Sequence, residues 1–154
     1  MTTTYVAIAP GTSSGNTAAP LLSLTVTGYA GTLNVPTLQD IVINNGNDVF
    51  TWTQLNESSK QQIATLATNS IDTNCVVEEL SFFGNASATA GSAAKLGVFG
   101  LSQAKTKTNF SLNFGTKTIT GSGYITGLAP KISATEPVWV TPLKVTVTGD
   151  YTVA

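Results

Sequence analysis

A strict alternation of residue types governs the last third of this 154-residue chain. In the closing stretch "TPLKVTVTGDYTVA", apolar residues occupy one parity, and lysine, threonine and aspartate occupy the other. The stretches "NFSLNF" and "TITGSGYITGL" alternate in the same way. A period of two is that of a β-strand with one buried face. Three such strands with turn residues between them predict an antiparallel sheet.

Glycine shares the apolar parity in one of these strands. Gly121, Gly123 and Gly127 alternate with polar residues, on the same parity as Ile119 and Ile125. Glycines leave that side of a strand with little side-chain volume. We therefore expect a bulky group to approach the backbone there.

Weaker strand signals precede this region, and two segments have helical spacing. Asn56 followed by apolar residues at Ile63 and Leu66 predicts a helix over about 57–68, and Ser92 can cap a second over about 92–103. The predicted fold is mainly β, an antiparallel β-sandwich or partly rolled barrel flanked by these one or two short helices. The further strands are expected at 4–8, 22–29, around 41–43 and at 73–83.

We expect a single domain over residues 1–154, with two segments that leave its core. Residues 1–20 form an arm rich in glycine, serine and threonine, which lacks the apolar residues to order itself. Residues 44–70 form an excursion between two sheet strands. The large apolar side chains of both segments are candidates for contacts between subunits: Tyr5, Ile8, Phe50, Trp52, Leu55, Ile63 and Leu66.

Charge is scarce in this chain. Only 10% of the residues are charged, against about 25% in a typical domain. A polar but uncharged surface is weakly protected against self-association, which suggests surfaces covered by copies of the same chain. The net charge of −1 and the absence of clustered cations argue against nucleic-acid binding.

The usual catalytic groups are missing. Without histidine, the Ser-His-Asp and Cys-His arrangements are excluded in their usual form, and zinc sites nearly so. The single cysteine, Cys75, has apolar neighbours and is expected to be a buried thiol. "GSGYITG" does not meet the dinucleotide fingerprint. We expect no enzyme activity and no catalytic, cofactor-binding or metal site.

Two non-structural functions stay open. A carbohydrate-binding β-sandwich would use aromatic side chains converging on one groove. A glycosidase-like enzyme would need two carboxylates facing each other across a cleft. The aromatic candidates for a groove are Tyr29, Trp52, Tyr124, Trp139 and Tyr151.

The first residues, "MTTTYVAIAPG", show no basic segment and no long apolar run. We therefore expect no signal peptide. No apolar stretch approaches the roughly 20 residues needed to span a bilayer, so we expect no membrane partner.

From Ser70 onward the order of features resembles the tail tube protein of long-tailed phages and related contractile machines. "IDTNCVVEE" is similar to the strand after that family's long inter-subunit hairpin loop. A small-residue helix follows, and then the hairpin "FSLNFGTKTITGSGYITGL". Gly121, Gly123 and Ile125 match the family's G-x-G-x-[IV] strand, and Val147, Thr148 and Gly149 match the end of its final strand.

The resemblance implies a structural virion protein without enzyme activity. Six copies would form a ring, and stacked rings would form a hollow tail tube through which DNA passes without specific binding. The implied partners are the chain itself, a tail terminator, a baseplate or initiator protein and a sheath protein, in a virion tail made in the host cytoplasm. A capsid decoration or other virion structural protein is the alternative. The threonines that would suit an uncharged lumen wall are Thr118, Thr120, Thr146 and Thr148.

Overall fold

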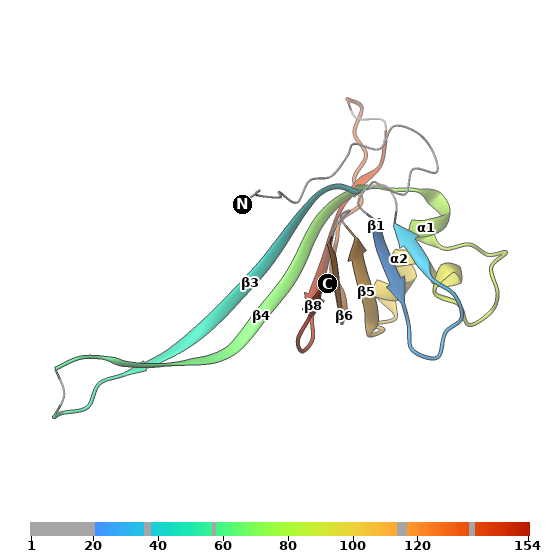
Figure 1. Cartoon of the computed structure of the whole chain (residues 1–154). Coiled ribbons are helices and arrows are strands. Elements are labelled where there is room, and N and C mark those ends of the chain that lie inside the picture. The colour runs from blue at the N-terminus through green and yellow to red at the C-terminus, as the bar shows by residue number, and fades with distance from the viewer. Residues whose placement is uncertain (1–20, 36–37, 57, 114–116, 136–137) are drawn as a thin grey trace, which may run out of the picture.

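The computed structural model describes residues 21–35, 38–56, 58–113, 117–135 and 138–154 (Figure 1). The predicted strand at 4–8 and the arm over 1–20 lie outside these ranges. The strands and helices of the described residues are β1 (Leu21–Thr25), β2 (Leu33–Val35), β3 (Leu38–Trp52), β4 (Gln61–Val76), α1 (Glu79–Phe83), α2 (Ala93–Gln103), β5 (Thr108–Asn113), β6 (Thr118–Leu128), β7 (Val140–Val147) and β8 (Thr152–Val153).

The strands form one antiparallel sheet in the order β2-β1-β5-β6-β7-β4-β3, and β8 pairs with β6 beyond the end of β7. The predicted mainly β, antiparallel fold with short helices is confirmed. The sheet does not close into a barrel. Strands β5, β6 and β7 agree well with the three strands that the alternation predicts.

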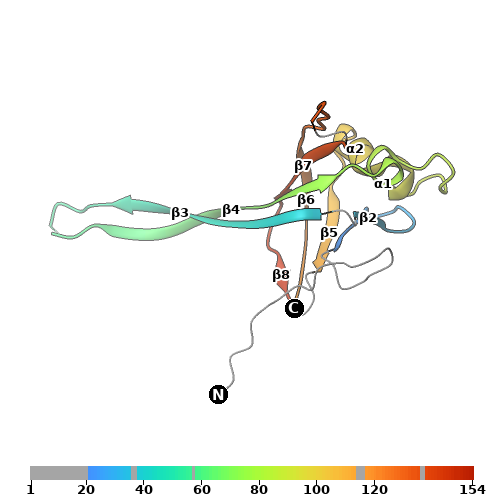
Figure 2. The same ribbon diagram turned by 90° about the horizontal axis from the view of Figure 1, so that it is seen from above.

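One face of the sheet carries the hydrophobic core. Alternate residues of β5 and β7 are buried, and α1 and α2 pack together on the side of the body away from the β3–β4 hairpin (Figure 2). Helix α2 contacts β6 and β2, so the helices close this face. The buried apolar residues include Leu22, Leu24, Phe82, Val98, Leu101, Phe110, Leu112, Leu143 and Val145.

The predicted helix over 57–68 is wrong, because this segment contains the tip of a hairpin and the first half of β4. Ile63 and Leu66 are three residues apart in the sequence, which fits a helical period and not the period of two of a strand. The neighbouring strand decides against the helix. Phe50 pairs with Ile63 and Trp52 with Gln61 across the hairpin, whereas an isolated helix of this length is marginal in water.

The segment after β4 also differs from its prediction. The strand expected over 73–83 ends at Val76, and α1 begins at Glu79. The Glu78 carboxylate accepts hydrogen bonds from the backbone N–H groups of Leu80 and Ser81, at 3.3 and 2.8 Å, and so caps the helix. The helix predicted over 92–103 is confirmed as α2, with a break at Gly97. The predicted cap is not formed, because the Ser92 hydroxyl donates to the Thr89 carbonyl at 2.6 Å and makes no hydrogen bond to the helix.

The bulky groups expected near the β6 glycines are present. A Cβ atom on Gly121 would lie 2.9 Å from Phe110 Cζ and 3.1 Å from Tyr151 Cβ. A Cβ on Gly123 would collide with the backbone oxygen of Thr146 on β7. Glycine therefore allows close packing on the core face and close approach of two strands.

Candidate functional site

The face of the sheet opposite the core is polar and largely uncharged. Hydroxyl groups pair across it: Thr120 with Thr152 at 2.7 Å, and Thr126 with Thr146 at 2.8 Å between oxygens. Ser23 of β1 donates to Asn34 of β2 at 3.0 Å. Because these polar groups satisfy one another, the face needs no charged partner. We call it the threonine face; its residues on β5 and β6 are Asn109, Ser111, Asn113, Thr118, Thr120, Ser122, Tyr124 and Thr126.

Three of the four threonines predicted for a lumen wall lie within strands of this face. Thr118 and Thr120 lie on β6, and Thr146 pairs with Tyr124 in the register of β7. Thr148 follows the end of β7, and its N–H donates to the Ser122 carbonyl at 2.7 Å. Strand alternation therefore brings Thr118, Thr120 and Thr146 to one side of the sheet, and Thr148 lies just beyond the end of β7. Their position is a feature of the fold, and their role stays a prediction.

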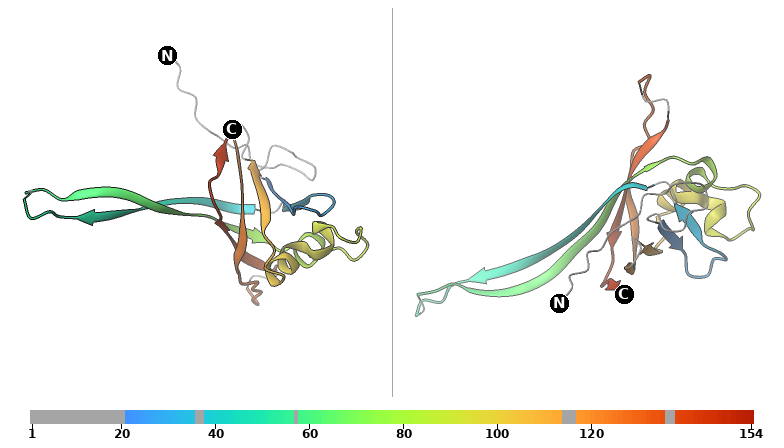
Figure 3. Two further views of the ribbon diagram at one scale, coloured as in Figure 1. Left: turned by 90° about the horizontal axis from the view of Figure 1, so that it is seen from below. Right: turned by 45° about the horizontal axis from the view of Figure 1, so that its top comes forward.

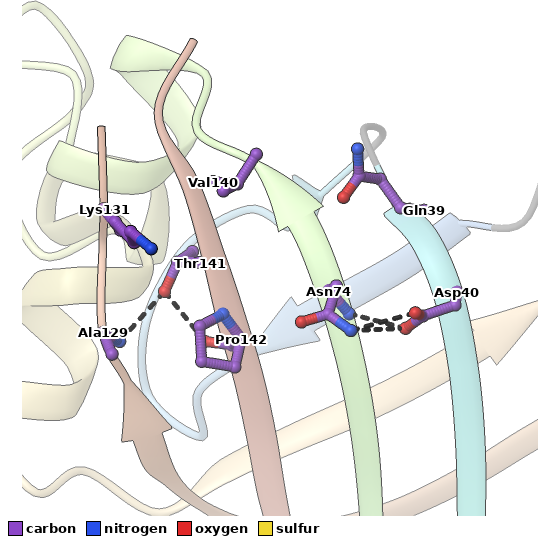
Figure 4. Close-up of a pocket in the computed structure, with 8 residues that line it drawn as sticks. All are labelled: Gln39, Asp40, Asn74, Ala129, Lys131, Val140, Thr141 and Pro142. Carbon is purple, nitrogen blue, oxygen red and sulfur yellow. Dashed lines mark hydrogen bonds between the residues drawn. The ribbon is translucent and has the colours of Figure 1, made fainter. Parts of the chain in front are cut away.

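Within the described strands, charged residues occur on β3, β4 and β7, which form the hairpin side of the sheet. Asp40 accepts from the backbone N–H of Asn74 at 3.0 Å and from its side-chain Nδ2 at 2.9 Å (Figure 4). Asp72 accepts from Asn44 Nδ2, one strand across. Lys144 pairs with Asp72 in the β4–β7 register. The β5 and β6 part of the face carries no charge among the described residues of these strands.

The β3–β4 hairpin extends far beyond the body of the molecule (Figures 1 and 3). Its pairing continues from Leu38 and Cys75 at the base to Trp52 and Gln61 near the tip. Strand β3 is the last in the sheet order, so no described strand pairs with its outer edge. Such an edge is a template for pairing with another chain.

The hairpin exposes large apolar side chains. Phe50 and Trp52 stack with ring centroids 5.9 Å apart, and Ile63 lies opposite Phe50. Phe50 is 59% exposed and Ile63 57% exposed. Leu55 is exposed at the tip; the side chain of Leu66 lies outside the described residues, as do Tyr5 and Ile8. Phe50, Trp52 and Ile63 therefore form one exposed apolar surface on the hairpin, called here the hairpin patch.

Further exposed apolar side chains lie outside the contact residues predicted from the sequence. Leu80 and Phe83 lie on α1. Ile132, Val138 and Trp139 lie in the connection between β6 and β7, and we call them the connection patch. Trp139 in "VWV" was a signal, but nothing in the local pattern separates exposed from buried apolar residues.

A shallow cavity of about 380 Å³ lies between the base of the hairpin and β7 (Figure 4). Its polar groups bond to one another. Thr141 Oγ1 accepts from the Ala129 N–H at 3.0 Å and donates to the Pro142 carbonyl at 2.9 Å, and Asn74 holds Asp40. This arrangement stabilises the sheet edge and presents no activated nucleophile to a substrate.

The remaining described residues show neither a reactive thiol nor a cluster of metal ligands. Cys75 is buried on the core face, and burial raises the pKa of its thiol to about 11. Such a thiol is unreactive at neutral pH. Within the described ranges, no three or more aspartate, glutamate or cysteine side chains gather where they could hold a metal ion. No helix in that part of the chain is long and apolar enough to cross a membrane.

The aromatic residues considered for a sugar-binding groove do not converge. Trp52 lies on the distal hairpin, whereas Trp139 lies in the connection at the opposite end of β7. Tyr124 lies on the threonine face, and Tyr151 is half-buried against Gly121. Their separation argues against a common groove for a glycan.

Comparison with known proteins finds similar folds among solved structures. No protein-family model matches the sequence. No curated protein matches it either. Among solved structures, a chain from the tail of an empty gene transfer agent particle with C6 symmetry matches with a TM-score of 0.63 and 14% identity, over 92% of this chain and 99% of that one.

Two other assemblies contain similar chains. The SPP1 tail tube protein matches with a TM-score of 0.59 and 11% identity, over 85% of this chain and 74% of that one. A chain of the six-fold symmetrised anti-feeding prophage baseplate matches with a TM-score of 0.61 and 9% identity, over 100% and 97%. The structural neighbours are thus tail tube and related tail proteins, and the resemblance inferred from residues 70–154 is confirmed as a shared fold.

Proposed function

We propose that this chain is a structural virion protein that assembles with copies of itself into the tube of a phage-type tail. The observation that carries the proposal is the fold, which matches chains of assembled tails and a baseplate over nearly its whole length. Two surfaces add physical support. The threonine face is largely uncharged and suits a neutral wall, and the hairpin patch exposes apolar side chains that a partner would cover.

The arrangement we propose is a stack of six-membered rings. Six-fold symmetry is that of the gene transfer agent tail and of the anti-feeding prophage baseplate. The outer edge of β3 would be covered by a neighbouring copy, which removes an exposed strand edge. The partners in this proposal are further copies of the chain and the proteins that end the tube, namely a terminator and a baseplate or initiator protein, with a sheath protein outside it.

The threonine face would line the lumen of this tube, with Thr118, Thr120, Thr146 and Thr148 in the wall. The β5 and β6 part of this wall carries no cation among the described residues, so it gives passing DNA few sites for counterion release, and DNA slides without specific binding. The role is structural and needs no catalytic group. A capsid decoration protein of the same fold is the competing function, and it would not form a hollow tube.

Electron microscopy of the purified full chain across a concentration series, with light scattering alongside, tests the proposal. We expect rings or hollow tubes whose length grows with concentration. Adding an initiator complex from a matching tail provides a second condition, since nucleation can limit assembly. A monomer that persists in both conditions would reject the tube function and favour the decoration protein.

The lumen assignment has a test of its own. The double variant Thr118→Lys/Thr120→Lys adds two cations per subunit to the proposed wall and should slow DNA ejection from tails that still assemble. A matched variant, Ser87→Lys/Thr89→Lys, adds the same two cations in the exposed loop between α1 and α2 and should leave ejection unchanged. Equal ejection rates for both double variants would show that the threonine face is not the wall.

A further inference from the structure

Asn45 is followed by Gly46 on β3, and both residues are exposed. In an Asn-Gly pair the backbone nitrogen of the glycine can attack the side-chain amide carbon of the asparagine, because glycine has no Cβ atom to block the approach. Such pairs are therefore the asparagine sequences that deamidate most readily in peptides. No other asparagine of this chain precedes a glycine in the sequence.

This pair lies where β4 loses its second neighbour. Strand β4 pairs with β7 only from Ser70 onward. Asn45 pairs with Asn69, the first residue of β4 on the hairpin side of that point, and Gly46 pairs with the next one. Figures 1 and 3 show the two-stranded ribbon extending free of the body. A two-stranded ribbon is marginally stable in water, so its pairs open more readily than those of the body.

Asn69 provides an internal comparison, because it also precedes a small residue, Ser70. It is only 8% exposed. Ser70 pairs with Asn44 on β3 and with Thr146 on β7, so its backbone is held between two strands. Attack on the amide needs a backbone that has left the extended conformation of a strand. Asn45 reaches that state when the ribbon opens, whereas Asn69 reaches it only when the body opens too.

We propose that Asn45 deamidates spontaneously in the unassembled chain, and that the isoaspartate formed there removes the chain from tube assembly. The second part rests on the proposed function; the first part does not. Deamidation needs no enzyme and no co-reactant other than water.

The reaction has two steps. The Gly46 nitrogen bonds to the side-chain carbon of Asn45, the carbon–nitrogen bond of the side-chain amide breaks, and the NH₂ group leaves as ammonia with the proton that the Gly46 nitrogen gives up. Water then opens the cyclic imide, adding OH to one carbonyl carbon and H to the ring nitrogen. Opening at one carbonyl gives aspartate, and opening at the other gives isoaspartate.

Isoaspartate changes the main chain and not only the charge. The chain then runs through the former side chain of Asn45, which adds one methylene group, about 1.5 Å, to β3. Side chains beyond this point no longer match their partners on β4, because strand pairing depends on register. They include Phe50 and Trp52 of the hairpin patch. The buried residues of β4, Ile71 and Cys75, lie in the body. The body is therefore kept while the hairpin patch is disrupted.

Mass spectrometry of the aged, unassembled full-length chain tests the modification. After incubation at mildly alkaline pH in water enriched in heavy oxygen, the peptide that contains Asn45 should carry one heavy oxygen atom. A protease that cleaves before aspartate should leave the isoaspartate fraction uncut. The converted fraction at Asn45 should be at least about tenfold that at Asn69, which corresponds to an opening free energy lower by about 1.4 kcal/mol. An intact Asn45, or equal conversion at both sites, would overturn the proposal.

Two variants should block the reaction without disturbing the strand. Gly46→Ala places a methyl group beside the attacking nitrogen, and the new Cβ atom would lie 3.4 Å from the Thr68 carbonyl oxygen, an ordinary contact. Asn45→Gln keeps an amide but requires a larger ring, which forms slowly. The double variant Asn45→Asp/Gly46→Ala carries the new charge without the added methylene group. Conversion of Gly46→Ala as fast as the parent chain would show that the attack does not come from this nitrogen.

Assembly of aged samples, followed by electron microscopy and light scattering, tests the second part. The aged parent chain should lose tube formation in proportion to its isoaspartate fraction, while its urea denaturation midpoint stays unchanged. Aged Gly46→Ala and Asn45→Gln should assemble like fresh protein, and so should fresh Asn45→Asp/Gly46→Ala. Undiminished assembly of isoaspartate-containing chains would overturn this part, and so would failure of the charge-only variant to assemble.

The outcomes separate this inference from the proposed function. A fresh parent chain that never forms rings or tubes would reject the tube function and the second part with it. Conversion at Asn45 is measured on unassembled protein, so the first part is decided in either case. Normal tubes from a chain whose Asn45 never converts would reject the inference and leave the tube function standing.

Discussion

Strand β4 passes through two regions that differ in what surrounds them. In the body, Ile71 is 2% exposed; in the hairpin, Ile63 on the same strand is 57% exposed. In the body, α1 and α2 close the face on which Ile71 lies, whereas the distal hairpin has only β3 beside it. The same residue type on one strand is therefore buried or exposed according to what packs beside it.

The two regions also differ in what stabilises them. The body has strands on both sides of β4 and a helical layer over its core. A two-stranded ribbon without such a layer is marginally stable in water. The hairpin keeps apolar residues that its own chain does not cover, so their stabilising contribution is expected only in an assembly.

The sharpest test of this comparison replaces the same residue type in both regions. Ile71→Ala should lower the free energy of unfolding by about 2–5 kcal/mol, because it removes buried methyl groups and leaves a cavity. Ile63→Ala should change it by less than about 0.5 kcal/mol, because the side chain is already in water. Urea denaturation of unassembled protein measures both.

Tube assembly should be more sensitive to Ile63→Ala than the stability of the single chain is. Ile63→Ala should weaken tube formation while its fold stays intact, as judged by circular dichroism. A large loss of monomer stability for Ile63→Ala would mean that the hairpin packs on its own chain, and the distinction between the two regions would disappear.

The fold was predictable where local pattern and local environment agree. Strands β5, β6 and β7 were found because their alternation, turn residues and single buried face coincide. Helix α2 was found because Ser92 precedes a run of small residues. The threonines of the polar face were found by the same alternation, which places them opposite the core.

The misses come from non-local contacts. The spacing of the apolar residues in 57–68 fits a helix, but pairing with β3 makes most of this segment a strand. Helix α1 has only five residues, too few for a periodic signal, and depends on its Glu78 cap and on packing against α2. The exposure of Ile132 and Val138 depends on what the rest of the chain leaves uncovered, which no local window contains.

A second test disturbs the packing of α1 on α2, the helical layer that covers the body but not the hairpin. Gly97 has a φ of 68°, which L side chains rarely adopt. A Cβ atom at this position would collide with the Gly84 backbone nitrogen and would lie only 2.6 Å from the Phe82 carbonyl oxygen. Gly97→Ala should therefore destabilise the protein by about 3 kcal/mol, from backbone strain and displaced backbone. Thermal unfolding followed by circular dichroism measures this loss.

Gly100→Ala in the same helix is the matched control. Its Cβ would meet only the Leu96 side chain, at 3.1 Å, and alanine favours a helix by up to about 1 kcal/mol over glycine. We expect stability within about 1 kcal/mol of the parent chain. Equal effects of the two alanines would show that the crossing of α1 and α2 at Gly84 and Gly97 is not what fixes the layer.

The smallest expected effect concerns the cap that starts this layer. Hydrogen bonds from Ser81, through its side chain and its backbone N–H, lower the pKa of the Glu78 carboxyl. A lowered pKa in the folded state means that the carboxylate stabilises the fold above its unfolded pKa, near 4.5, and that this contribution is lost as pH falls through the folded value. Glu78→Gln should thus lower the free energy of unfolding by about 0.5–1 kcal/mol at pH 7, and by almost nothing at the acidic end of a series of urea denaturations at decreasing pH.

Glu79→Gln is the control: it removes an equal charge from the first turn without touching the cap, and should lower the free energy of unfolding by less at pH 7. If the Glu78→Gln deficit stayed constant down to pH 3, the cap carboxylate would not be its source, and the helical layer would owe its position to the glycine crossing alone.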